Sequence, residues 1–131
     1  MSAIYELLKA AVEQSASDLH ITVGIPPVIK IGSEFKRMGE KPLTPDAAGK
    51  LVRDLFPKDI LFQELQQEGD KDFSFSVPGL SRFRVNAFMQ RGSYAAVVRV
   101  VPFSLPDPDR LNIPKQVQNL SQLTKGLVLV T

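Results

Sequence analysis

The sequence contains no cysteine and only one histidine, His20. The lack of cysteine excludes a disulfide framework and thiolate metal sites, and one histidine is too few for an all-protein zinc site. No apolar run approaches the roughly 20 residues that span a bilayer. The first residues, MSAIYELLKAAVEQ, contain two glutamates and no basic segment. We therefore expect no signal peptide and a cytoplasmic protein that does not insert into a membrane.

Two phosphate-binding motifs are also missing, GxxxxGK[ST] and GxGxxG. The 16 basic and 14 acidic residues give a net charge of only +2, so the composition does not support nucleic-acid binding. The hydrophobic fraction of 44% and the charged fraction of 23% are those of a soluble globular protein. A chain of 131 residues is long enough for one compact domain.

Apolar periodicity predicts an α+β fold in which an antiparallel sheet packs on helices. Helices are expected over residues 3–15, 45–56 and 58–68, and strands over 17–23, 28–32, 34–38 and 72–77. Thr44 before Pro45 is typical of a helix N-terminus, and Gly69 is typical of a helix end. A β-hairpin is predicted to follow.

This hairpin covers residues 82–101, RFRVNAFMQRGSYAAVVRVV, which include four arginines and no acid. A turn centred between Arg91 and Gly92 places Arg84 opposite Arg99 on one face. The other face is apolar and is expected in the core, with the facing pairs Phe83–Val100, Val85–Val98, Ala87–Ala96 and Met89–Tyr94.

Two interpretations of Arg84 and Arg99 are open. Both are consistent with solvated arginines on the exposed face of a sheet. However, like charges that face each other across strands are unfavourable, and the forked guanidinium suits a phosphate or carboxylate. We expect no compensating acid on this face, so the pair indicates an anion site. Arg82 either extends the site or is a surface residue.

The remaining polar residues predict no chemistry. His20 alternates with apolar residues beside Asp18, which is typical of a structural histidine that is hydrogen-bonded to a neighbour. Glu64 and Glu68 are expected on an exposed helix face. No carboxylate pair and no metal site are predicted.

The last 29 residues differ in character from the rest. Residues 103–110 combine prolines with polar residues, which predicts a stiff linker, and a short helix could run from Asn112 or Pro114 to Leu123. Residues 126–131 are an apolar run typical of a strand that is buried on both faces. Such a strand often precedes a phosphate loop. We therefore expect one domain over residues 1–102, a linker over 103–125 and the start of a second domain at 126–131.

Six segments together resemble the N-terminal region of type IV pilus retraction ATPases, the twitching-motility proteins of the secretion-ATPase superfamily. In chain order they are ASDLHI (16–21), GIPP (24–27), DFSF (72–75), RFRVNAF (82–88), VVRVVP (97–102) and GLVLVT (126–131). The resemblance covers nearly the whole chain.

The resemblance implies a PAS-like N-terminal domain joined by a linker to a RecA-like ATPase domain, of which 126–131 would be the first strand. It also implies a homohexamer at the cytoplasmic face of the inner membrane that works with the pilus machinery. Arg84 and Arg99 would reach the phosphates of ATP, bound with Mg²⁺ in the full-length protein, and Arg82 could join this patch. This segment alone would neither bind ATP tightly nor hydrolyse it.

The compact turn QRGS departs from relatives with a longer turn, so the resemblance assigns no role to Arg91. It also assigns none to Asp18 or His20. Two alternatives remain open, namely a pilus or secretion assembly ATPase and a standalone PAS-like module that binds a small ligand. A GxxxxGK[ST] motif after Thr131 would exclude the standalone module.

Overall fold

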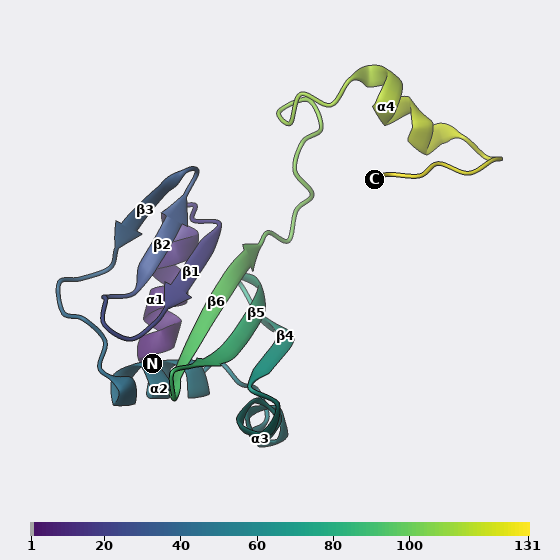
Figure 1. Cartoon of the computed structure of the whole chain (residues 1–131). Helices are drawn as coiled ribbons and strands as arrows, with labels where there is room; N and C mark the ends of the chain where they lie inside the picture. Colours follow the sequence, from purple (N-terminus) through teal and green to yellow (C-terminus); the bar gives the residue numbers. More distant parts are fainter. Residues whose placement is uncertain (1) are drawn as a thin grey trace.

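Six strands form one antiparallel sheet in the computed structural model, which describes residues 2–131 (Figure 1). The strands are β1 (Asp18–Ile21), β2 (Val28–Ile31), β3 (Glu34–Arg37), β4 (Asp70–Val77), β5 (Ser81–Gln90) and β6 (Ser93–Val101). Their order in the sheet is β3-β2-β1-β6-β5-β4. The predicted α+β class with an antiparallel sheet is confirmed.

The helices are α1 (Ala3–Glu13), α2 (Pro45–Arg53), α3 (Asp59–Glu68) and the short α4 (Lys115–Asn119), which a 3₁₀ turn (Leu120–Gln122) follows. The predicted caps are present. The Thr44 hydroxyl accepts a hydrogen bond from the Ala47 amide at 3.2 Å, and Gly69 ends α3 with a φ of 87°. This left-handed conformation favours glycine, which explains why α3 stops there.

The core lies between the sheet and the helices α1 and α2, with α3 against β4 and β5 (Figure 1). Most hairpin residues that the sequence places in the core are at most 1% exposed, among them Phe83, Val85, Ala87, Ala96 and Val98. Tyr94 and Val100 are half-buried against the core, but Met89 is 36% exposed at the end of the hairpin near the turn. The prediction that Met89 is a core residue is wrong.

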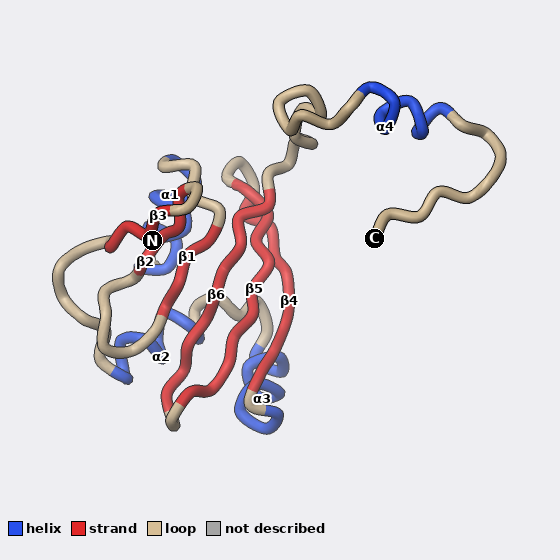
Figure 2. Tube along the Cα trace, turned by 45° about the horizontal axis from the view of Figure 1, so that its top comes forward, coloured by secondary structure: helices blue, strands red, loops and turns tan. Residues whose placement is uncertain are grey.

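Strand β1 joins the two halves of the sheet, because it pairs with β2 on one side and β6 on the other. Residues at the two ends of the folded region thereby become neighbours, and the long strands β4, β5 and β6 lie side by side (Figure 2). Helices α1, α2 and α3 pack against one face of the sheet. The opposite face, which we call the open face, presents Arg84 and Arg99 to solvent.

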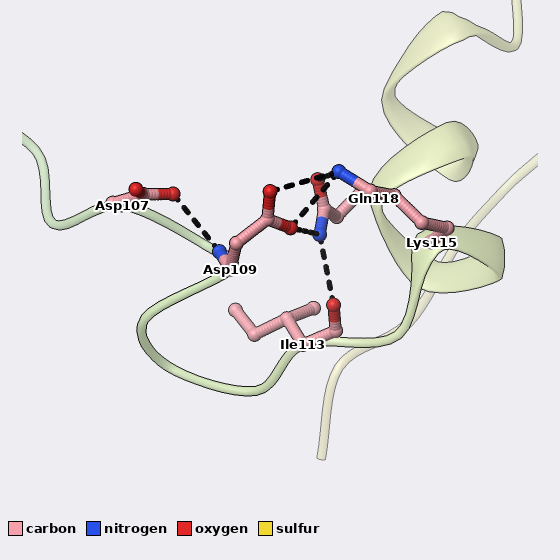
Figure 3. A network of polar contacts seen from close by, with 5 residues as sticks. All are labelled: Asp107, Asp109, Ile113, Lys115 and Gln118. Atoms are coloured by element: carbon pink, nitrogen blue, oxygen red, sulfur yellow. Dashed lines mark hydrogen bonds and ion pairs between the residues drawn. The ribbon is translucent and has the colours of Figure 1, made fainter.

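Residues 103–131 lead away from the end of β6 and are mostly exposed (Figures 1 and 2). A local network orders residues 107–118 (Figure 3). The Asp109 carboxylate accepts hydrogen bonds from Lys115 Nζ at 3.0 Å and from Gln118 Nε2 at 2.8 Å. Gln118 Nε2 also donates to the Ile113 carbonyl, and the Asp109 amide donates to Asp107.

Residues 126–131 form no strand in the structure, and the side chains of Leu127 and Val130 are 82% and 97% exposed. The sequence predicts a strand here that is buried on both faces. No neighbouring strand pairs with this backbone within residues 2–131, so its hydrogen-bonding groups and apolar side chains face solvent. None of the described helices has the length and apolarity needed to cross a bilayer.

Candidate anion-binding site

The register of β5 and β6 places Arg84 directly opposite Arg99, which confirms the predicted pairing. Both side chains are exposed on the open face. Arg99 is also opposite Asp18 of β1, and Asp18 is opposite Lys30 of β2. One row of side chains thus crosses the whole sheet from β3 to β4, in the order Phe35, Lys30, Asp18, Arg99, Arg84 and Ser74.

Asp18 forms an ion pair with Arg99, in which Arg99 Nε donates to Asp18 Oδ1 at 3.1 Å. The expectation that no acid compensates the arginines on this face is therefore wrong. These two residues are 81 positions apart, so no local pattern connects them. Only the pairing of β1 with β6 brings them together, and hairpin register cannot predict that pairing.

The carboxyl group of Asp18 is largely shielded from water, since its side chain is only 10% exposed. Burial raises the pKa of this carboxyl, but hydrogen bonds from Ser17 and Arg99 together with the charge of Arg99 outweigh it. The pKa of Asp18 therefore lies below its usual range. Asp18 is thus an ionised, hydrogen-bonded acid beneath an exposed guanidinium.

The two arginines differ in how they are held. Arg99 has the Asp18 ion pair, although its side chain is 68% exposed. No ion pair or side-chain hydrogen bond of Arg84 occurs within residues 2–131. Within residues 2–131 Arg84 is therefore an unpaired cation beside an anchored one, and an anion that binds both would offset their mutual repulsion.

A cavity of about 150 Å³ lies at this point of the open face, and it has room for several water molecules. Its lining combines both arginines with acidic, amide and apolar side chains, namely Asp18, Asp72, Arg84, Asn86, Val97 and Arg99. Arg82 does not line it. Arg91 lies at the hairpin turn with a φ of 50° and lines a different cavity of about 290 Å³.

His20 lies in the next row of the open face, opposite Val28 and Val97. Its ring contacts Phe35 edge-on, with the centroids 5.7 Å apart. The Nε2 atom is buried and has no hydrogen-bond partner, so the hydrogen bond expected for a structural histidine is not found at this atom. Within residues 2–131 no group of three or more potential metal-binding side chains is present.

Comparison with protein-family models gives no match. The type IV pilus retraction ATPase PilT of Pseudomonas aeruginosa is 37% identical over 98% of this chain, which covers 37% of that protein. A twitching motility protein of Neisseria gonorrhoeae is 30% identical over 98% of the chain, which covers 34% of it. The chain thus spans about a third of the length of these relatives.

Solved structures give the same assignment. The crystal structure of the pilus retraction motor PilT with bound ADP matches 94% of this chain with a TM-score of 0.76 and 35% identity, and the match covers 36% of that motor. The Legionella pneumophila ATPase DotB matches 88% of the chain at 21% identity with a TM-score of 0.60, which shows a shared fold, and the match covers 32% of DotB. By sequence and by fold, this chain is homologous to the N-terminal region of type IV pilus retraction ATPases such as PilT.

Proposed function

We propose that this chain is the PAS-like N-terminal domain of a hexameric type IV pilus retraction ATPase. In this proposal Arg84 and Arg99 reach the phosphates of ATP that is bound by the ATPase domain of a neighbouring subunit. The observation that carries the proposal is the register of β5 and β6, which sets two exposed arginines against each other on the open face.

The charge geometry suits a phosphoryl group. Guanidinium forks donate parallel N–H bonds to phosphate oxygens, and preorganised cations stabilise the charge that spreads over the transferring group. Arginine fingers of this kind raise turnover by about 10³–10⁵-fold. Without an anion the facing arginines repel each other, so a bound anion would make the arrangement more favourable.

The division of the chain follows from the same proposal. Residues 1–102 are the N-terminal domain, residues 103–125 are the linker, and residues 126–131 begin a RecA-like ATPase domain. The exposed apolar side chains of Leu127, Leu129 and Val130 support this division, because a strand in a parallel sheet would bury them on both faces.

Nucleotide and metal chemistry lies outside this segment in the proposal. Mg²⁺ would neutralise charge on the phosphates of ATP, but the residues described here do not fit a Mg²⁺ site. The Asp18 carboxylate is already engaged by Ser17 and Arg99, and no three potential ligands cluster. The proposed partners are neighbouring subunits and the pilus machinery at the cytoplasmic face of the inner membrane, with no membrane insertion and no nucleic acid.

Alanine variants in the full-length motor test this proposal. We expect Arg84→Ala and Arg99→Ala each to lower the ATP turnover number at least tenfold while the melting temperature stays within a few degrees. Lysine at either position should restore turnover only in part, because it lacks the fork. Arg37→Ala removes an exposed arginine from β3 and serves as the control. Wild-type turnover in both arginine variants would refute the proposal.

A further inference from the structure

The way Arg99 is held leaves its outer end available. A guanidinium has five N–H groups, one on Nε and four on the two terminal nitrogens. Asp18 Oδ1 accepts the bond from Nε at 3.1 Å. The terminal nitrogens of Arg99 make no hydrogen bond or ion pair with any residue from 2 to 131. The acid therefore fixes the inner edge of the guanidinium and leaves the outer edge to another partner.

Asp18 is itself held firmly. Its second oxygen, Oδ2, accepts a hydrogen bond from the Ser17 hydroxyl at 2.8 Å, and its side chain is 10% exposed. Its backbone is fixed between β2 and β6 by hydrogen-bonded pairing on both sides. An exposed ion pair between two mobile side chains contributes little, but here one partner is a buried anchor in a central strand. Arg84 has no comparable anchor.

We infer that Asp18 is a positioning residue for Arg99, which it orients so that the terminal nitrogens face an incoming phosphate. The inference deepens the proposed function and rests on it. A competing role, in which Asp18 blocks Arg99 until nucleotide displaces it, requires the carboxylate to occupy the terminal nitrogens. The bond to Nε is compatible with simultaneous phosphate binding. The carboxylate also offsets the repulsion between Arg99 and Arg84 before the phosphate arrives.

The kinetic test compares variants in the full-length motor. We expect Asp18→Ala to lower kcat about tenfold to a hundredfold, because small misplacements of a reacting group have effects of this size. The KM for ATP should change less than threefold. Asp18→Asn keeps an oxygen that accepts from Nε and should retain more activity than Asp18→Ala. Asp70→Ala removes an exposed acid from the same face and is the matched control.

A double variant separates positioning from general damage. If Asp18 acts through Arg99, adding Asp18→Ala to Arg99→Ala should lower kcat no further. Higher turnover in Asp18→Ala than in the wild type would show that Asp18 competes with the phosphate for Arg99, and it would overturn the inference. An equal loss of kcat from Asp18→Ala in the presence and in the absence of Arg99 would overturn it as well. If Arg99→Ala itself leaves turnover unchanged, the proposed function fails and the inference fails with it. If Asp18→Ala has wild-type turnover while Arg99→Ala has reduced turnover, the inference fails but the proposed function does not.

The anchor can also be observed in this chain without the rest of the motor. In ¹⁵N NMR spectra, the Arg99 Nε–Hε signal should be protected from exchange at pH 7, while the Arg84 signal should exchange rapidly. In Asp18→Asn, Arg99 should exchange faster but still more slowly than Arg84. Inorganic pyrophosphate should shift the terminal nitrogens of Arg99 without loss of the Nε protection. Loss of that protection upon binding would show that the phosphate displaces Asp18 and would overturn the inference.

Discussion

Replacing Arg84 with methionine should stabilise this chain, whereas replacing Arg99 with methionine should destabilise it. Both substitutions keep an aliphatic stem and remove one charge from the facing pair. Arg84 forms no ion pair within residues 2–131. Although the Asp72 carboxylate lines the same cavity, loss of Arg84 mainly relieves its repulsion from Arg99, with a gain of about 0.5 kcal/mol. Loss of Arg99 leaves the shielded Asp18 carboxylate with Ser17 as its remaining side-chain donor, which costs about 1–2 kcal/mol.

Thermal unfolding monitored by circular dichroism at low salt measures both effects. For a domain of this size we expect the melting temperature to rise roughly 2 °C for Arg84→Met and to fall roughly 4–8 °C for Arg99→Met. At about 1 M salt the Debye length is roughly 3 Å. The gain for Arg84→Met should then disappear, while most of the loss for Arg99→Met persists because Asp18 is largely buried.

Arg37→Met serves as the control, since it removes an exposed arginine from β3 away from the pair. Its melting temperature should match that of the wild type at both salt concentrations. Equal changes of the same sign for Arg84→Met and Arg99→Met would refute the reasoning, because they would show that Asp18 does not distinguish the two arginines.

Three further substitutions test other parts of the fold. The depressed pKa of Asp18 contributes stability that is present above about pH 3.9 and is lost as the pH falls through the lower folded pKa. Asp18→Asn should thus weaken the pH dependence of the free energy of unfolding, measured in urea, over this acidic range. An unchanged pH dependence would contradict the ion pair. Phe83→Ala should cost about 3–5 kcal/mol in urea unfolding, because Phe83 is 0% exposed; a loss below 1 kcal/mol would contradict its place in the core. Thr44→Ala should lower the melting temperature by the equivalent of about 1 kcal/mol through loss of the α2 cap, and Thr44→Ser should preserve it.

Local patterns in the sequence predict much of this fold. The cap at Thr44, the glycine that ends α3 and the arginine facing pair all depend on residues close together in the chain, where periodicity and turn chemistry act. Met89 departs from the core pattern, because alternation assigns a face of the strand but does not show where the covering helices end.

The contact between Asp18 and Arg99 is the main feature that the sequence does not predict. It depends on β1 inserting between β2 and β6, which is a choice among sheet topologies. Alternation correctly places Asp18 on the open face, but it cannot show that the side chain is shielded there. Residues 126–131 have the sequence pattern of a strand but form none in the structure. A segment with such a pattern becomes a strand only where a neighbouring backbone can pair with it.

The two arginines illustrate how a binding site can conflict with stability. Facing cations weaken the isolated sheet, and one buried acid compensates only one of them. The remaining charge is what an anion would recognise. Stabilising substitutions at Arg84 should therefore reduce activity in the proposed motor.

Mixed hexamers test most directly the central claim, that the arginines act on a neighbouring subunit's nucleotide. One subunit would carry Arg84→Ala and Arg99→Ala with an intact ATPase domain, and the other would carry intact arginines with the lysine of its phosphate loop replaced. Each alone should be nearly inactive. If the arginines act between subunits, the mixture should hydrolyse ATP well above the sum of the two, because some interfaces combine intact arginines with an intact site. Activity no greater than that sum would contradict the account.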